Sequence, residues 1–410
     1  MNEIDLQQFP PISRPLFFVR RILLPVIGLV IGASDVFAHE GVEHGDVARA
    51  PRAELATAAA FGPDGHLYAV GKDGGHLVLR ISDDDGASWR SPVRVNVEPE
   101  AIAADGDSQP RIAFAADGAL LVSWTKPLTR PYTGEIRLAR LEPGAGTFDA
   151  PITVHRDRAE ITHRFQNLIV SPDGHVTVIW IDKRDQEAAK ARKQAYRGAA
   201  IYTAVSSDGG RHFAEERRVA DYSCECCRIA LSSDPDGTPV AMWRHVFAPN
   251  ERDHALTRLR PDGTPESVIR ATNDLWRVDA CPHQGPGLTV DGSGVRHAVW
   301  FNMRNGEGHV FYGRPTPSGV EGQIPVGGPR AAHADIASAG QALAIVWTEF
   351  DGTRNQLRGL RSNDGGRNFM ALDIAATAGG ADQPRALVRD GKLYAFWRQA
   401  DAGYRLYALP

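Results

Sequence analysis

A single pattern of apolar and polar positions recurs along most of the chain. In each copy, an apolar run leads to a turn that contains glycine, and alternating apolar residues follow. Six copies end in tryptophan, as in "LIVSPDGHVTVIW" and "RALVRDGKLYAFW". Asp-Gly between two such runs is typical of a β-hairpin, because glycine adopts the positive φ that a tight turn requires. The pattern therefore predicts a series of hairpins.

The spacing of the copies indicates the architecture. The tryptophans that end them are Trp124, Trp180, Trp243, Trp300, Trp347 and Trp397, at intervals of 56, 63, 57, 47 and 50 residues. A weaker copy spans residues 56–71 and has Gly71 in place of tryptophan. Repeats of about 50 residues hold about four short strands each, as β-propeller blades do. We predict an all-β propeller of four-stranded antiparallel blades, with seven blades favoured and six as the alternative, and we expect the indole rings to fill the space between blades.

Three units share a second phrase, Ser-x-Asp-x-Gly-x-x-aromatic. Its residues are Ser82, Asp84, Gly86 and Trp89; Ser206, Asp208, Gly210 and Phe213; and Ser362, Asp364, Gly366 and Phe369. The phrase resembles the Asp box of the sialidase-like (BNR-repeat) propellers, and the resemblance covers roughly residues 50–410. It implies that each phrase forms the turn between the third and fourth strands of a blade, with a structural aspartate and an aromatic ring that packs inside.

The first 38 residues have the layout of a secretory signal peptide. Three arginines precede an apolar run of 11 residues from Ile22, and small residues follow it up to Ala38. Such a run is short for a membrane span, although an uncleaved anchor is the alternative. We expect residues 1–38 to be removed, residues 39–53 to form a polar leader whose end supplies the strand that the last unit lacks, and residues 54–410 to form the propeller. The protein is then periplasmic or secreted, with no membrane span after cleavage.

Charge and one insertion bear on the partners of the protein. The formal net charge is −4, and without a basic excess we expect no nucleic-acid partner. Residues 183–198 follow the repeat that ends in Trp180 and are rich in Ala, Lys, Arg and Gln. They predict a short helix, which is either a docking site for a protein partner or a solvated excursion.

All four cysteines fall in two short segments. Cys224, Cys226 and Cys227 lie in "DYSCECCRIAL", and Cys281 lies two residues before His283 in "DACPHQGPGL". Both segments lead into the inner strands of neighbouring blades, the fourth and the fifth, so we expect them to meet at the mouth of the central channel. Thiolates with imidazole suit soft metals. We predict that these five residues form the ligand pool of a copper site, with zinc or a redox-active thiol as alternatives.

Three further residues are weaker metal candidates. His245 and Met303 lie in the loops after Trp243 and Trp300, and cleavage after Ala38 would expose His39 at a new N-terminus. The structural alternative is a pair of disulfides, since exported proteins meet an oxidising compartment. A bridge between the adjacent Cys226 and Cys227 would be strained.

The resemblance implies a second function, glycoside hydrolysis of the exo-α-sialidase type. Sialidases hold the carboxylate of the substrate with three arginines and use a tyrosine nucleophile, a glutamate and an aspartate. The matching candidates here are Arg111, Arg228 and Arg385, which begin equivalent inner strands, and Tyr222 and Glu225, which share one segment. The Arg-Ile-Pro motif of the family is missing and no aspartate matches, which puts the chemistry in doubt. A non-catalytic propeller that binds other molecules is the third alternative.

Overall fold

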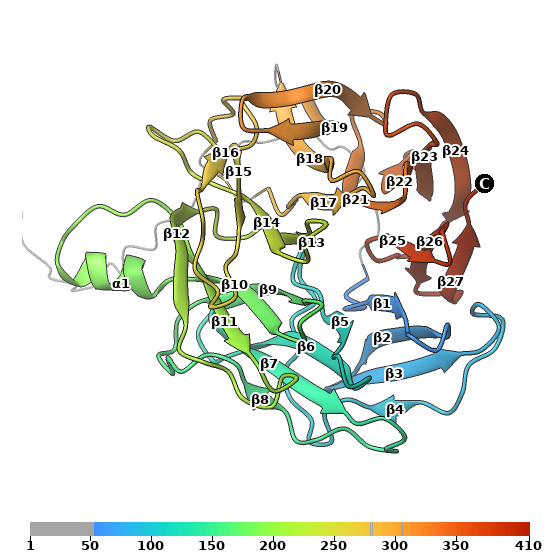
Figure 1. Cartoon of the computed structure of the whole chain (residues 1–410), viewed down its shortest axis with the longest axis horizontal. Helices are drawn as coiled ribbons and strands as arrows, with labels where there is room; N and C mark the ends of the chain where they lie inside the picture. Colours follow the sequence, from blue (N-terminus) through green and yellow to red (C-terminus); the bar gives the residue numbers. More distant parts are fainter. Residues whose placement is uncertain (1–52, 279, 281, 305–306) are drawn as a thin grey trace, which may run out of the picture. The chain divides into compact units, whose positions relative to one another are not determined.

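The computed structural model describes residues 53–278, 280, 282–304 and 307–410, which form seven antiparallel sheets around a ring (Figure 1). The predicted signal peptide, the leader with His39, and Cys281 lie outside the described residues. The seven sheets confirm the propeller and its favoured blade count. The one helix among the described residues, α1, is too short and too polar to cross a membrane.

The first three blades run from β1 to β12. Blade 1 holds β1 (Ala58–Phe61), β2 (Leu67–Asp73), β3 (His76–Ser82) and β4 (Val93–Arg94). Blade 2 holds β5 (Arg111–Phe114), β6 (Leu120–Pro127), β7 (Gly134–Leu141) and β8 (Ile152–Thr153). Blade 3 holds β9 (His163–Val170), β10 (Val176–Asp182), β11 (Ala199–Ser206) and β12 (Arg217–Ser223), with α1 (Arg184–Ala191) between β10 and β11.

The other four blades run from β13 to β27. Blade 4 holds β13 (Ala230–Ser233), β14 (Pro239–Arg244), β15 (His254–Arg258) and β16 (Ile269–Arg270). Blade 5 holds β17 (Gly287–Val290), β18 (Arg296–Arg304), β19 (Glu307–Thr316) and β20 (Gly319–Val326). Blade 6 holds β21 (Ala331–Ala339), β22 (Ala342–Phe350), β23 (Asn355–Ser362) and β24 (Met370–Thr377). Blade 7 holds β25 (Arg385–Arg389), β26 (Lys392–Gln399) and β27 (Gly403–Ala408).

Strands follow one another in sequence order from the centre of the ring outward. The first strand of each blade contacts the first strands of both neighbours, including β25 against β1, so the ring is closed. Blade 7 has three strands among the described residues. The segment predicted to supply its fourth strand, 47–53, lies outside them apart from Ala53.

The blades are held together by seven apolar clusters, one at each junction between neighbours. The six repeat tryptophans confirm their expected place: each packs in the cluster that its own blade shares with the preceding blade, and none is more than 3% exposed. A buried indole ring removes a large apolar area from water. The junction between blades 7 and 1 lacks a repeat tryptophan, because Gly71 stands at that position.

The three Ser-x-Asp-x-Gly phrases form turns between the third and fourth strands of blades 1, 3 and 6. In the first of them, Ser82 Oγ donates to Asp84 Oδ1 at 2.8 Å and accepts from the amide of Gly86 at 2.7 Å. The hydroxyl and amide of Ser88 donate to Asp84 and lower the pKa of its carboxyl. The other two turns repeat these bonds, so the aspartates serve the turn.

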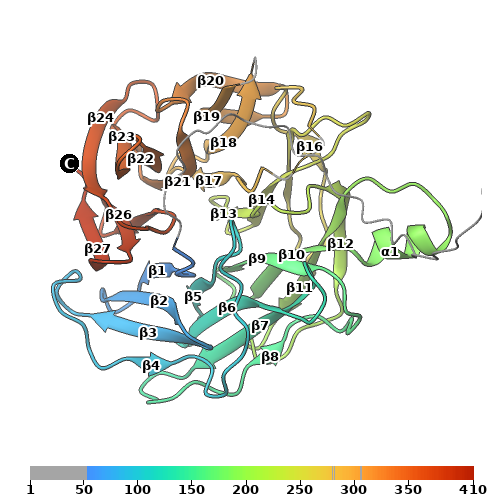
Figure 2. The ribbon, with the colours of Figure 1, turned by 180° about the vertical axis from the view of Figure 1, so that it is seen from behind.

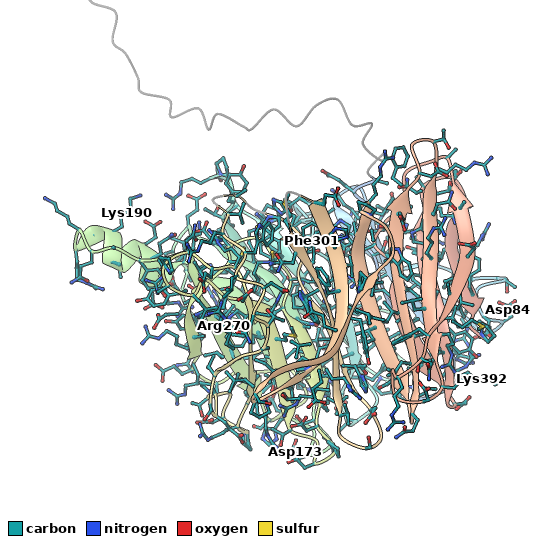
Figure 3. The ribbon with its side chains drawn as sticks, turned by 90° about the horizontal axis from the view of Figure 1, so that it is seen from above. Asp84, Asp173, Lys190, Arg270, Phe301 and Lys392 are labelled. Carbon is teal, nitrogen blue, oxygen red and sulfur yellow. The ribbon has the colours of Figure 1, made fainter. Side chains whose placement is uncertain are left out.

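The ring has two distinct sides. Turns between first and second strands lie on one side, here called the hairpin side, where Asp173 and Lys392 are seen in Figure 3. The other side, called the loop side, carries the segments that lead into the first strand of each blade. The α1 excursion follows β10 at the loop side and extends beyond the ring of blades in two opposite views (Figures 1 and 2). It confirms the helix predicted within residues 183–198.

Candidate metal centre

The three described cysteines lie in the segment that passes from β12, the outermost strand of blade 3, to β13, the innermost strand of blade 4. Tyr222, near the end of β12, adopts a positive φ of 62°, which is uncommon for a residue other than glycine. The amide of Cys224 then donates to the carbonyl of Arg244 at 2.9 Å, and Ser223 Oγ donates to the carbonyl of Cys224 at 2.9 Å. These bonds fix the start of the segment against β14.

Cys224, Cys226 and Cys227 bring their sulfur atoms together; we call them the thiol triad. The Sγ atom of Cys224 lies 3.8 Å from both other Sγ atoms, which are 4.0 Å apart. A disulfide requires about 2.05 Å, and none of the three cysteines is in one. The common centre of the three positions lies about 2.2 Å from each sulfur. Metal–thiolate bonds have about this length, ~2.3 Å for zinc.

The thiol triad is buried, with its members 1%, 4% and 2% exposed. Its surroundings are largely apolar and come from blades 3 and 4: Phe165, Ile179, Ile181, Ile229 and Trp243 belong to the same cluster. The sequence predicted a site between blades 4 and 5 at the channel mouth. The structure instead directs the thiols into the junction of blades 3 and 4, because the segment crosses the rim at the place where these two blades meet.

Positive charge lies beside the thiols. Arg252 Nη1 is 3.7 Å from the Sγ atom of Cys224, within reach of a hydrogen bond to sulfur. Hydrogen bonds from Cys226 and Cys227, aided by the guanidiniums of Arg244 and Arg252, lower the pKa of Cys224. Burial raises the pKa of Cys227. Negative charge therefore gathers on Cys224 first, and a thiolate is the form that binds a metal.

Trp243 distinguishes this junction from the other five that hold a repeat tryptophan. The other five indoles donate to an acceptor: Trp124 to Glu100, Trp180 to Asp182, Trp300 to Asp274, Trp347 to Glu349, and Trp397 to the carbonyl of Asp382. The indole N–H of Trp243 is buried and has no acceptor among the described residues. The thiol triad occupies the cluster in which that acceptor is missing.

Three other predicted ligands fall within the described residues: His283, His245 and Met303. His283, at φ 52°, packs against Gly106. The ring of His245 lies 4.4 Å from that of Phe247, and burial lowers its pKa to about 4. Met303 lies in β18 opposite Gly308. Within the described part of the chain, Cys224, Cys226 and Cys227 are the one group of His, Cys, Asp and Glu side chains that could hold a metal.

The cysteine segment is joined to the α1 excursion. Glu225 forms an ion pair with Lys183 and accepts from Gln186 Nε2 at 3.1 Å. Tyr222 stacks beneath Arg197, whose guanidinium carbon lies 4.2 Å from the ring centre. Tyr222 and Glu225, the candidates for sialidase chemistry, thus have partners in or beside the excursion.

The three candidate arginines do converge. Arg111, Arg228 and Arg385 line one cavity of about 200 Å³ along the inner strands, together with Asp335. The guanidinium of Arg228 is used by the protein, since it donates to the carbonyls of Pro286 and Ala334 and to the side chain of Gln383. Nε of Arg111 and Nη2 of Arg385 are buried without a partner among the described residues.

Asp107 contacts Arg228, one of the residues that line this cavity, and it was not among the candidates that the sequence suggested. Its fully buried carboxylate accepts from the amides of Arg228 at 3.2 Å and Gly285 at 2.5 Å, and from Gln383 Nε2 at 3.1 Å. Burial alone would raise its pKa, but Arg228 and His333 hold the pKa of Asp107 well below its usual range. Segments that lead into five blades meet here. The one signal in the sequence is the repeated Gln-Pro-Arg at 109–111 and 383–385.

Comparisons with known proteins show the fold. No family model matches the sequence, and a comparison with curated proteins finds no match. An ulvan lyase of a new polysaccharide lyase family is similar at TM-score 0.55 and 11% identity, over 88% of this chain and 93% of its own. The alpha-L-arabinofuranosidase of Fusarium graminearum is similar at TM-score 0.51 and 11% identity, over 75% and 92%. Sialidases are also found, one from Hadza microbes at TM-score 0.47 and 14% identity, over 84% and 73%. At such identities, a shared propeller fold carries no shared activity.

Proposed function

We propose that the protein binds a soft metal ion, copper in the Cu(I) state, through Cys224, Cys226 and Cys227. The observation that carries the proposal is the triangle of sulfur atoms with sides of 3.8, 3.8 and 4.0 Å. Its centre is at metal–thiolate distance from all three, and soft thiolates select Cu(I) among the available metals. An apolar, buried setting excludes water and competing hard ligands.

Charge favours Cu(I) over Zn(II). Three thiolates and one Cu(I) ion leave a charge of about −2, which the guanidiniums of Arg244 and Arg252 balance. Zn(II) in a structural site takes four ligands in a tetrahedron, and the thiol triad supplies three. Buried charge is tolerated when it is paired. The two positive charges of the arginines therefore match a trigonal Cu(I) site better than a Zn(II) site.

The compartment expected for the protein is compatible with a role in copper handling. The predicted signal peptide would place it in the periplasm or outside the cell, where unprotected thiols are oxidised. Burial and a bound Cu(I) ion would both keep the thiol triad reduced. We propose that the propeller is an exported copper-binding protein.

The proposal is tested by measuring the metal content of the purified protein together with its number of free thiols. The mature chain is purified without chelator from copper-supplemented cells, and about one copper per chain is expected. The double variant Cys224→Ser/Cys226→Ser leaves one thiolate and should abolish binding, whereas Cys226→Ser alone should weaken it, because the soft thiolates supply the affinity for Cu(I). Cys281→Ser is the matched control and should retain the metal. A chain whose thiols are all reduced but which takes up no copper from an excess would overturn the proposal.

Sialidase-like glycoside hydrolysis is the second candidate. It is supported by the convergence of Arg111, Arg228 and Arg385 on one cavity and by the three Ser-x-Asp-x-Gly turns, which we take as Asp boxes. The partners of Arg228, Tyr222 and Glu225 weigh against it. Release of sialic acid from a sialoside, lost in Arg111→Gln, would favour this candidate.

A further inference from the structure

The junction between blades 7 and 1 is built differently from the other six. Gly71 stands where the other blades have tryptophan, and a Cβ atom at Gly71 would collide with the side chains of Arg398 and Tyr404. These two side chains therefore occupy the space that an indole fills elsewhere. The apolar cluster of this junction is the smallest of the seven, with Leu67, Ala69, Phe396 and Tyr404 as its buried members.

The reduced packing leaves a cavity of about 350 Å³, here called the junction pocket. Its side chains of chemical interest are Arg80, Arg398, Arg405, Trp89 and Tyr404. The remaining lining residues are small or neutral, and none is acidic. The volume suits a ligand of one ring, at the lower end of the range for small-molecule sites, ~300–1,000 Å³.

None of the three guanidiniums of the junction pocket forms an ion pair in the described part of the chain, and the one carboxylate that interacts electrostatically with Arg398 is the buried side chain of Asp382. Arg398 donates to the carbonyl of Leu55 at 2.8 Å, and Arg405 to the carbonyl of Tyr404 at 3.2 Å. At the hairpin side of the same junction, Arg389 is instead paired with both carboxylate oxygens of Asp85. Several like charges in a concave site attract an anion, and guanidinium–oxyanion bonds are among the strongest in proteins.

The aromatic rings add a flat apolar wall. The ring centres of Trp89 and Tyr404 lie 5.3 Å apart, and the guanidinium carbon of Arg398 lies 4.8 Å from the centre of the Tyr404 ring. Tyr404 is 8% exposed, so its ring is held by its neighbours. A planar ring or the apolar face of a sugar packs well on such a wall.

We propose that the junction pocket binds a small cyclic carboxylate, with its carboxylate against Arg80 and Arg405 and its ring on Trp89 and Tyr404. The site is independent of the thiol triad, which lies at the junction of blades 3 and 4. It is formed because the tryptophan repeat is interrupted at the one junction that joins the two ends of the propeller.

Titration calorimetry of the mature full chain tests the proposal, with benzoate and glucuronate as probes and inorganic sulfate as the ring-free anion. At least one cyclic carboxylate should bind at a single site, and sulfate at least tenfold more weakly. Arg80→Gln and Arg405→Gln should each weaken binding about tenfold or more, because each removes a charge-assisted bond. Arg94→Gln is the matched control, since Arg94 is an exposed arginine of blade 1 outside the pocket, and it should leave binding unchanged.

Three outcomes would overturn the proposal. They are no saturable binding of either carboxylate, binding that both pocket variants leave unchanged, and sulfate binding as tight as that of the carboxylates. Thermal unfolding checks that the variants are folded. Arg405 lies on an exposed part of the last strand, so Arg405→Gln carries the test if Arg80→Gln is unstable.

Discussion

At the scale of residues, the chemistry of this protein depends on how charge is distributed around sulfur. Cys224 has the lowered pKa of the thiol triad, and its Sγ atom is 3.7 Å from Arg252 Nη1. The proximity of the three cysteines could be predicted, because they are separated by at most three positions in the chain. The contacts of the two arginines with the thiols could not be assigned, because Arg244 ends β14 and Arg252 lies in the loop after it, and the approach of both depends on how blade 4 packs against the cysteine segment.

Replacing Arg252 with Gln should raise the pKa of Cys224, because a positive charge near the thiolate is removed. Thiolate absorbance of the reduced, metal-free protein, followed against pH, measures the change. Arg260→Gln is the control, since Arg260 is an exposed arginine of the same blade that bonds to Thr264 and Pro265. A titration curve identical to that of the wild type would show that Arg252 does not stabilise the thiolate.

At the scale of elements, the second strand of each of blades 2 to 7 carries the tryptophan that packs the blade against the preceding one. Alternation along a strand sends every second side chain to the same face, so the apolar pattern alone was enough to assign these tryptophans to the core. The same pattern located Gly71 as the exception. It could not show what fills the gap, since Arg398 and Tyr404 come from the other end of the chain.

Trp397→Ala should lower the free energy of unfolding by about 3–5 kcal/mol, because a fully buried indole in β26 is replaced by a cavity. Denaturant unfolding measures the loss. Trp89→Ala, at a half-buried ring in the turn before β4, should cost about 1–2 kcal/mol. Equal losses for the two variants would contradict the role of the repeat tryptophans as the main contacts between blades.

At the scale of the whole molecule, the ring is held at its axis by polar contacts as well as by the junctions. Asp107 and Arg228 connect segments of blades 2, 4, 5, 6 and 7. The partners of Asp107 are up to 276 positions away in sequence. No local sequence pattern predicts such a contact. The repeated Gln-Pro-Arg indicated only that the segments at 109–111 and 383–385 are alike.

Asp107→Asn should lower the free energy of unfolding by about 3–5 kcal/mol, because it leaves the buried charge of Arg228 unpaired. Asp373→Asn is the control. Asp373 is 84% exposed and pairs with Arg358, which is itself 40% exposed, so its loss should cost about 0–1 kcal/mol. Calorimetric unfolding compares the two, and a stable Asp107→Asn protein would show that the axial contacts are dispensable.

The sequence by itself determined the all-β class, the seven units, the turns and the buried tryptophans, because each of these follows from periodicity within about 50 residues. It also indicated that three thiols lie close together, because Cys224, Cys226 and Cys227 are near neighbours in the sequence. The tertiary structure alone decided that they enter the junction of blades 3 and 4, that Asp107 connects segments of several blades, and that the junction of blades 7 and 1 holds a basic pocket with aromatic walls. These features depend on how distant segments pack across the ring, and contacts between distant segments leave no periodic trace in the chain.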